Sequence, residues 1–360
     1  MRAAIFHQGR FSTGEIPDPR LAEGQVLVRT RACGICGSDL HAAKYTEDFV
    51  DLARRSGGRF QMSVDRPVVF GHEFVGEVVE NGPGTEGRFR PGTLVTSMPL
   101  TIAGNQVLGI GYNPDVAGGF AEYLPLAERM LLPLPAGMDP DHAALVEPIA
   151  VGIHAVEYGR MAPDDVALVI GCGPIGIAVI AALRLQGIAP IIAADFSPAR
   201  RDLARRMGAD IVLDPRQASP YAALEQAITP AGFDPGRHAQ LFGLSPRRRG
   251  AVLFECVGMP GMIQEMMAGA PAGARIVVVG VCMQPDRSEP FFGIVKQLNL
   301  QFVLAYTKEE FAATLEHIGS GRIDVSPLIT GRVGLEGVGQ AFEDLASPER
   351  HAKVLVEPWR

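Results

Sequence analysis

Side chains that commonly bind metal ions are concentrated in the N-terminal part of the sequence. Cys36 and His41 fall within one short segment, and His72 and Glu73 follow after a gap. A thiolate, an imidazole and a carboxylate from separate segments form a soft, tetrahedral site suited to Zn²⁺, and three protein ligands leave a fourth position open for substrate or water. The pattern therefore predicts a catalytic zinc.

A structural zinc and a site without metal are the two alternatives. A structural zinc needs four tight ligands, usually from two closely spaced cysteine pairs, but no second pair follows Cys33 and Cys36. Taken singly, Cys36 is also compatible with a small buried residue, and His72 with a hydrogen-bonded loop histidine. A second motif further along the chain favours the catalytic interpretation.

That motif is a glycine-rich turn between an apolar strand and an apolar helix. Residues 166–170 are VALVI, and the turn from Gly171 to Gly176 is GCGPIG. In a dinucleotide-binding unit Gly171 allows the tight turn, Gly173 admits the pyrophosphate and Gly176 lets the helix pack on the strand. The flanking elements make this motif more specific than its glycines alone.

An acidic residue follows where such a unit binds the ribose. The apolar strand at 190–194 ends in Asp195, about twenty residues after the turn, where a carboxylate accepts hydrogen bonds from the ribose hydroxyls. Its charge would repel a 2′-phosphate, which predicts NAD rather than NADP. Arg200 and Arg201 on the following helix are the counterargument, because they could reach a phosphate. The alternative for Asp195 is an ordinary turn carboxylate ahead of the helix that starts at Ser197.

Two kinds of secondary structure are expected to position these motifs. Up to about residue 150 the chain contains short β-strands separated by Gly and Pro, for example 25–31 and 74–80, which predicts a barrel-like domain. From about residue 152 strands and helices alternate, with further strands at 209–214, 251–255 and 275–280. This alternation predicts an α/β domain with a doubly wound parallel sheet.

Composition argues against several classes of protein. A chain of 360 residues is long enough for about two domains, each with its own core. A net charge of −7 with dispersed arginines leaves no footprint for nucleic acid. Gly171 and Arg184 interrupt the apolar stretch 166–194, which fits a buried βαβ unit and no membrane span. Five irregularly spaced cysteines and the lack of an apolar leader predict a reducing, cytoplasmic setting.

Two segments are expected to be additions to the basic fold. Residues 46–55 have Thr46 as a potential N-cap, acids in the first turn and arginines in the last, which predicts a short helix. Because it lies between the two donor motifs, we expect residues 45–60 to cover the substrate pocket; a surface excursion is the alternative. Residues 231–250, rich in Pro, Gly and Arg, are expected to form a loop of the coenzyme domain.

Seven segments in order resemble the zinc-dependent medium-chain dehydrogenase/reductase family, in its sorbitol, butanediol and threonine dehydrogenase-like branch. The resemblance covers nearly the whole chain and is carried by residues 34–41, 71–76, 118–123, 146–155, 171–176, 254–258 and 277–280. It implies a discontinuous, β-rich GroES-like catalytic domain (1–151 and 307–360) and a NAD-binding Rossmann domain (152–306). The active site is then expected in the cleft between the two domains.

The resemblance also implies a ligand set for one catalytic zinc. Cys36 and His72 match two ligands, and Glu147 stands where the third originates. Glu73 is the complication, because in parts of the family the corresponding glutamate binds zinc directly or exchanges with substrate or water. Asp39 is expected to orient His72 from behind.

Further roles follow from the same resemblance. Ser38 matches the hydroxyl that relays the proton, and His41 the solvent-side base, for which a plain surface histidine is the alternative. Glu73 is grouped with them as a catalytic residue. The coenzyme is expected to contact Gly171, Gly173, Pro174, Ile175, Gly176, Asp195, Arg200, Val257 and Gly280.

The sequence departs from the family pattern in two places. Many relatives carry four cysteines for a structural zinc in the region of residues 85–115, and this chain has none there, so we expect one zinc per chain. Sorbitol dehydrogenases have an arginine before a tyrosine that binds the polyol, whereas this chain has Ala305 before Tyr306. A less hydroxylated secondary alcohol, diol or hydroxyketone is therefore favoured over a sugar polyol.

The predicted function is reversible hydride transfer between a secondary alcohol or diol and NAD. The alternatives are a carbonyl reductase that uses NAD(P)H in the cell and a catalytically silent nucleotide-binding member of the family. The presence of Cys36, His72, Glu147 and Ser38 together argues against a silent site. The expected partners are a small-molecule substrate and further copies of the chain, as a homodimer or homotetramer joined through the strand near 300–304; no nucleic acid or membrane partner is expected.

Overall fold

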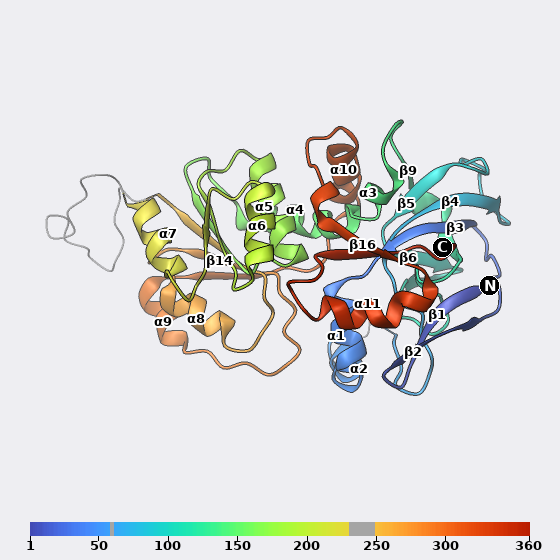
Figure 1. The fold of residues 1–360 in the computed structure, drawn as a ribbon, viewed down its shortest axis with the longest axis horizontal. Helices are drawn as coiled ribbons and strands as arrows, with labels where there is room; N and C mark the ends of the chain where they lie inside the picture. Colours follow the sequence, from blue (N-terminus) through green and yellow to red (C-terminus); the bar gives the residue numbers. More distant parts are fainter. Residues whose placement is uncertain (58–60, 230–248) are drawn as a thin grey trace, which may run out of the picture. The chain divides into compact units, whose positions relative to one another are not determined.

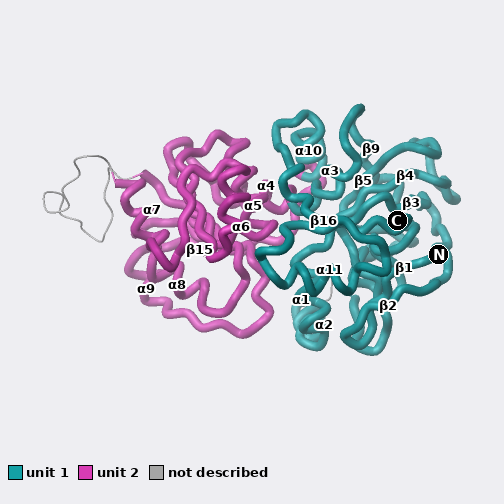
Figure 2. Tube along the Cα trace, in the orientation of Figure 1, with its two compact units in different colours: residues 1–148, 311–360 teal, residues 149–310 magenta. Residues whose placement is uncertain are grey.

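The chain folds into two compact units. The computed structural model describes residues 1–57, 61–229 and 249–360. Unit 1 comprises Met1–Pro148 and Phe311–Arg360, and unit 2 comprises Ile149–Glu310 (Figure 2). The divisions fall inside helices α4 (Val146–Gly159) and α10 (Lys308–Gly319), close to the domain boundaries expected from the sequence. The loop expected at 231–250 lies almost entirely outside the described residues.

A mainly antiparallel sheet of seven strands forms the centre of unit 1. Its strand order is β16-β17-β3-β4-β5-β9, and β8 pairs with β3 beside this path. The hairpins β1–β2 and β6–β7 form two further small sheets. The strands of unit 1 are β1 (Arg2–His7), β2 (Arg10–Glu15), β3 (Gln25–Gly34), β4 (Glu73–Asn81), β5 (Leu94–Ser97), β6 (Leu100–Ala103), β7 (Gln106–Gly109), β8 (Tyr123–Ala127), β9 (Leu131–Pro133), β16 (Ile329–Val333) and β17 (Lys353–Val356) (Figure 1).

The pairing of β3 with two other strands brings distant parts of the sequence together. The last residue of β3, Gly34, pairs with Glu73 at the start of β4. Gly34 also pairs with Leu355 of β17, and the Ile35 amide donates to the Val354 carbonyl just beyond (3.0 Å). Residues near 34, 73 and 354 therefore meet at one place in the sheet.

Unit 1 also contains α1 (Gly37–Lys44), α2 (Thr46–Arg55), α3 (Pro140–Ala143) and α11 (Val338–Leu345). The helix expected at 46–55 is present as α2, but the expectation that Thr46 caps it was wrong. Tyr45 ends α1 and immediately precedes α2, so Thr46 already lies in the first turn. Its hydroxyl donates to the carbonyl of Ala42 instead (2.9 Å). Phe49 and Val50 of α2 pack against the core of unit 1.

A parallel sheet of six strands in the order β12-β11-β10-β13-β14-β15 forms the centre of unit 2, as the alternating pattern predicted. All five residues of β10 are buried, as expected for a strand covered on both faces. The strands are β10 (Val166–Ile170), β11 (Ile191–Ala194), β12 (Ile211–Leu213), β13 (Ala251–Glu255), β14 (Arg275–Val278) and β15 (Asn299–Phe302). The helices include α5 (Pro174–Leu185), α6 (Pro198–Arg206), α7 (Pro220–Ile228), α8 (Met262–Gly269) and α9 (Pro290–Lys296). In the described ranges, no helix combines the length and the apolar character that crossing a membrane requires.

Candidate active site

Cys36 and Asp39 are held at the start of α1. Cys36 immediately precedes the helix, and its backbone amide donates to Oδ2 of Asp39 three residues later (3.0 Å). This contact satisfies one of the amides that a helix start leaves unpaired. It also fixes the buried Asp39 carboxylate beneath the cysteine.

His72 reaches the same place from the turn before β4. The turn requires Gly71, whose φ is +102° and whose hypothetical Cβ would come within 2.7 Å of the Phe120 ring. Nδ1 of the buried His72 lies 3.2 Å from Oδ1 of Asp39, close enough for an ion pair although not aligned for a hydrogen bond. The expected contact between Asp39 and His72 is therefore present.

The donor atoms of Cys36, His72 and Glu73 converge within 4.8 Å of one another. Burial by itself lowers the pKa of His72, but the Asp39 carboxylate and the Cys36 sulfur raise it by more, so that it lies well above its ordinary value. The negative field that raises this pKa would equally favour a bound cation, and a neutral imidazole, a thiolate and a carboxylate form a donor set that fits a zinc ion. These residues are thus chemically compatible with the metal that the sequence predicts.

Glu73 has a partner that the sequence did not indicate. Nζ of Lys353 donates to both carboxylate oxygens of Glu73 (2.7 and 2.6 Å) and to the Ile35 carbonyl (3.0 Å), and both charged side chains are fully buried. A Cβ on Gly34 would collide with Oε2 of Glu73, so glycine is required beside this pair. The carboxylate is therefore fixed and its charge neutralised by the lysine.

Glu147, the third ligand expected, does not belong to the cluster of converging donors found among the described residues. It lies in the first turn of α4. Burial lowers the pKa of Lys353, whereas the charges of Glu73, Cys36 and Glu147 raise it, and the net shift is upward. The field of Glu147 thus reaches the same buried lysine that binds Glu73.

Ser38 contacts the sulfur of Cys36 directly. Its hydroxyl donates to Sγ of Cys36 (3.1 Å), and it contacts the hydroxyl of Tyr112 (2.8 Å), which lies 3.0 Å from Oδ1 of Asp39. His41 lies one turn after Ser38 on the same helix, so the two side chains share a face. Burial and then the nearby Lys44 lower the pKa of His41, which keeps its imidazole neutral near pH 7. Sequence reasoning did not find Tyr112, because an isolated tyrosine in a loop carries no motif.

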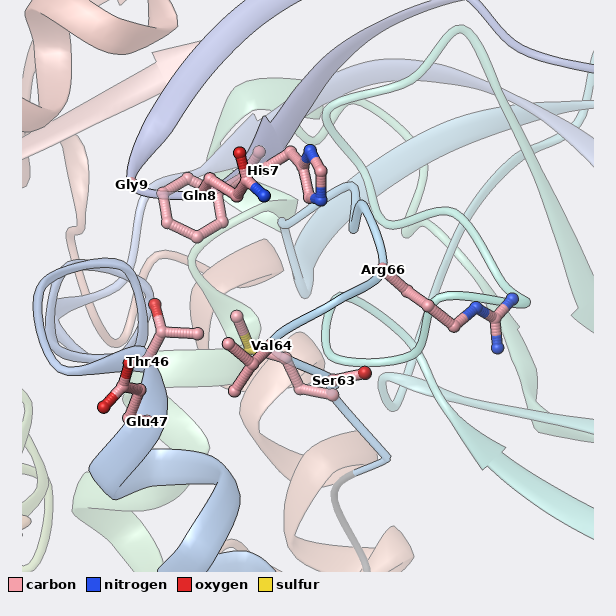
Figure 3. A pocket seen from close by; sticks show the side chains of 10 residues that line it. His7, Gln8, Gly9, Thr46, Glu47, Ser63, Val64 and Arg66 are labelled. Carbon is pink, nitrogen blue, oxygen red and sulfur yellow. The ribbon is translucent and has the colours of Figure 1, made fainter.

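A separate pocket of about 250 Å³ opens on another part of unit 1 (Figure 3). It is lined by the turn between β1 and β2, by the start of α2 and by residues of the segment 62–66. None of Cys36, His72 and Glu73 lines it. The pocket is therefore distinct from the donor cluster.

In unit 2 the three glycines of the turn differ in their surroundings. Gly171 has a φ of +89° and Gly176 packs so closely that a Cβ there would collide with the Gly171 carbonyl oxygen. A Cβ on Gly173, in contrast, would meet nothing closer than the Arg200 guanidinium at 3.9 Å. Pro174, which has no N–H, and Ile175 then begin α5, and the first amides of a helix have no intrahelical partner and can bind an anion.

Asp195 lies beside this turn and is bonded to the backbone. Its Oδ2 accepts from the Cys172 amide and its Oδ1 from the Ser197 amide (both 2.7 Å), and Nη1 of Arg200 lies 4.0 Å from Oδ2. Nη1 of Arg201 donates to the backbone carbonyls of Asp195 (2.9 Å) and Phe196 (2.8 Å) and lies 3.2 Å from Oδ2 of Asp214. Asp195 is therefore fixed by the backbone of the turn, and each of its oxygens keeps a lone pair for a further hydrogen bond.

Val257 and Gly280 are brought to the same end of the sheet by a buried glutamate. Oε1 of Glu255, the last residue of β13, accepts from the amides of Val257 (2.7 Å) and Gly258 (2.8 Å). A Cβ on Gly171 would approach the Val257 side chain (2.8 Å), and one on Gly280 would collide with the Gly258 amide. The structure therefore gathers these predicted coenzyme residues around the turn, with Glu255 as an organiser that the sequence did not indicate.

Comparison with known proteins supports both halves of this description. Residues 22–136 match the family model of the alcohol dehydrogenase GroES-like domain, and residues 174–320 match that of the zinc-binding dehydrogenases. The (R,R)-butanediol dehydrogenase of Bacillus subtilis is 30% identical over 99% of this chain and 100% of its own. Sorbitol dehydrogenase from the same organism is 27% identical over 100% of this chain and 98% of its own.

The fold has a close counterpart among solved structures. The crystal structure of 2R,3R-butanediol dehydrogenase from Bacillus subtilis superimposes with a TM-score of 0.80 and 28% identity, covering 99% of both chains. The matched domains, the converging donors of unit 1 and the glycine turn of unit 2 lead to one conclusion. The chain belongs to the zinc-dependent medium-chain dehydrogenase/reductase family.

Proposed function

We propose that the protein is a zinc-dependent dehydrogenase that transfers hydride reversibly between a secondary alcohol or diol and NAD. The observation that carries the proposal is the convergence of Cys36, His72 and Glu73 donors within 4.8 Å, with the Ser38 hydroxyl on the cysteine sulfur. A relay hydroxyl beside a metal-binding thiol is what alcohol oxidation requires, because the alcohol must lose a proton as well as a hydride.

We propose Cys36, His72 and Glu147 as the ligands of the substrate-bound zinc, with Glu73 able to join them. Nζ of Lys353 donates to both oxygens of Glu73, and Glu73 still places an oxygen within 4.8 Å of the Cys36 and His72 donors. Each carboxylate oxygen keeps a lone pair, so Glu73 can bind a metal while the lysine balances its charge. When bound, zinc supplies a Lewis acid that lowers the pKa of the substrate hydroxyl.

The chain's own residues then move the proton. The Ser38 hydroxyl can accept the proton of the substrate alcohol while it donates its own hydrogen onward. His41, neutral near pH 7 because burial lowers its pKa, is suited to take up that proton at the solvent end. Asp39 holds the imidazole of His72 from behind, which fixes the ring for metal binding.

The proposed coenzyme is NAD. The carboxylate of Asp195 lies at the turn and would repel the 2′-phosphate of NADP. Arg200 is near enough to Asp195 (4.0 Å) to offset part of this repulsion, whereas Arg201 is engaged by Asp214. A kcat/KM for NAD well above that for NADP is expected, and the opposite preference would contradict the assignment.

The proposed substrate is poor in hydroxyl groups. The butanediol dehydrogenase relatives act on a short diol by name, and this chain has Ala305 where polyol-binding relatives have an arginine. The test is a panel of alcohols of increasing size and hydroxylation, followed by NADH absorbance, together with metal analysis of the purified protein. We expect turnover of secondary alcohols or diols and close to one zinc per chain; two tightly held zincs, or no turnover with any alcohol, would contradict the proposal.

We also propose that two copies of the chain associate through the edge strand β15. Phe302, the last residue of β15, is 62% exposed, Leu304 two residues later is 64% exposed, and Phe291 of α9 is 72% exposed. An exposed apolar edge strand invites pairing with another strand. Light scattering should give a dimer or tetramer for the wild type, and Phe302→Glu should shift the population toward monomer.

A further inference from the structure

We propose that Tyr112, supported by Phe49 of α2, is a positioning residue of the active site: it fixes both the relay hydroxyl of Ser38 and the carboxylate of Asp39. The inference rests on the proposed function. Tyr112 comes from the region where many relatives bind a structural zinc, and this chain has no cysteine there. In this protein that region contributes a tyrosine to the catalytic site.

The backbone brings Tyr112 to the site by a close approach. Gly111 has a φ of +90°, and a Cβ there would meet the backbone of Gly71 at 3.1 Å. Gly71 is the residue before His72, so the segment carrying Tyr112 packs directly on the turn that carries the metal ligand. The side chain of Asn113, next in sequence, donates to the Gln61 side chain (2.8 Å), which ties this segment to the one preceding β4.

The hydroxyl of Tyr112 contacts two groups but has one hydrogen to donate. Asp39 Oδ1 lies at 3.0 Å and can only accept when ionised, whereas Ser38 Oγ at 2.8 Å can donate or accept. The consistent arrangement has Tyr112 donating to Asp39, so the Ser38 hydrogen can turn between Tyr112 Oη and Cys36 Sγ, 3.1 Å away. Burial and the charges of Asp39 and Cys36 raise the pKa of Tyr112 well above its ordinary value, so the hydroxyl remains protonated.

The ring of Tyr112 links the metal ligand to α2. Its centroid lies 5.3 Å from that of the His72 ring and 5.4 Å from that of the Phe49 ring, both in tilted arrangements. The buried tyrosine therefore packs near both His72 and Phe49 of α2. Through Phe49, α2 therefore supports the position of the Tyr112 ring. This role does not depend on whether α2 also covers the substrate.

The test is Tyr112→Phe, which removes the hydroxyl and keeps the ring. The matched control is Tyr221→Phe, which removes a tyrosine hydroxyl bonded to a carboxylate, Glu265 (3.1 Å), in unit 2. Zinc affinity is measured by competition with a chelator, and kcat and KM are measured on an alcohol that the wild type oxidises. We expect Tyr112→Phe to weaken zinc binding about tenfold and to lower kcat by a similar factor with little change in KM, whereas Tyr221→Phe changes none of them.

A double-mutant cycle separates the two actions of the hydroxyl. In a Ser38→Ala background the effect of Tyr112→Phe on kcat should shrink, because the relay is already lost, while its effect on zinc affinity through Asp39 should persist. If Tyr112→Phe does not fold, Phe49→Leu is the second variant, expected to act in the same direction by a smaller factor. Zinc binding and kcat that match the Tyr221→Phe control, in an active wild type, would overturn this inference alone; a wild type that neither binds zinc nor oxidises an alcohol would overturn the proposed function with it.

Discussion

The candidate sites of the two units differ in the groups that form them: backbone in unit 2 and side chains in unit 1. The glycine turn of unit 2 is made of backbone from one stretch of chain, residues 171–176, where Gly173 leaves open space and Gly171 and Gly176 allow close packing. The donor cluster of unit 1 is made of side chains, and the partners that hold them come from far along the sequence: Lys353 lies 280 residues from Glu73. The backbone site depends on side chains being absent, and the side-chain site depends on every buried group having its partner.

This difference predicts that the donor cluster is the more sensitive to single substitutions. Cys36→Ala and His72→Ala each remove one donor atom. We expect kcat to fall by more than the roughly 10–100-fold that is typical when a residue hydrogen-bonded to a metal ligand is removed. The fold should persist, because neither unit needs the metal for its core. Metal analysis, circular dichroism and alcohol oxidation measure these outcomes.

Cys282→Ala is the matched control, because this half-buried cysteine belongs to unit 2 and lies outside the donor cluster. It should keep both zinc and activity. Full activity in Cys36→Ala would show that the sulfur is not a ligand.

The second prediction concerns the partner that fixes Glu73. Lys353→Met leaves a fully buried carboxylate without its cation, and we expect the free energy of unfolding to fall by about 3–5 kcal/mol. Lys353→Met combined with Glu73→Gln should recover much of the loss, because no unpaired charge remains. Denaturant unfolding of the single and double variants measures both values.

The ion pair of Arg66 with Asp115 provides the comparison, because both side chains are more than half exposed (52% and 66%). Arg66→Ala should leave stability almost unchanged. A Lys353→Met variant as stable as Arg66→Ala would mean that the buried pair contributes nothing to the fold.

The same comparison explains what the sequence could predict. The glycine turn, the strand before it and Asp195 lie within one local segment whose spacing follows from the geometry of a βαβ unit, so the sequence alone identifies them. Their contacts with the coenzyme stay predictions. Cys36, His72 and the short α2 also carry local signals. Lys353 and Tyr112 do not, because β-pairing and loop packing bring them to the site from remote positions. A lysine at the start of an apolar strand suggests an exposed end, and only the pairing of β17 with β3 buries it against Glu73.

A third prediction compares two glycines of the backbone site. Gly176→Ala would push a methyl group into the Gly171 carbonyl, so we expect stability to fall by ~2 kcal/mol or more and coenzyme binding to be lost. Gly173→Ala has open space and a φ of −67°, which alanine adopts readily. Its stability should change by less than ~1 kcal/mol, while NADH affinity falls because the methyl group occupies the place of the pyrophosphate. Thermal unfolding and fluorescence titration with NADH separate the two effects. Equal NADH affinity in Gly173→Ala and the wild type would show that the pyrophosphate does not bind beside Gly173.

The smallest expected effect concerns His41, the base at the solvent end of the proposed relay. Burial and then Lys44 lower the pKa of His41 below its ordinary value of 6.5. Above this lowered pKa the imidazole is neutral and can accept a proton. Activity that depends on this base should therefore be complete near neutral pH and fall only as the pH drops through the lowered pKa.

His41→Gln should lower kcat/KM by ~10²-fold at most, and less if water reaches Ser38 directly. It should also flatten the acidic limb of the pH profile. The measurement is kcat/KM from pH 5 to 9 for the wild type and for His142→Gln, a histidine outside the donor cluster, as the control. A variant at position 41 whose acidic limb coincides with that of the control would assign the limb to another group and leave His41 as a surface histidine.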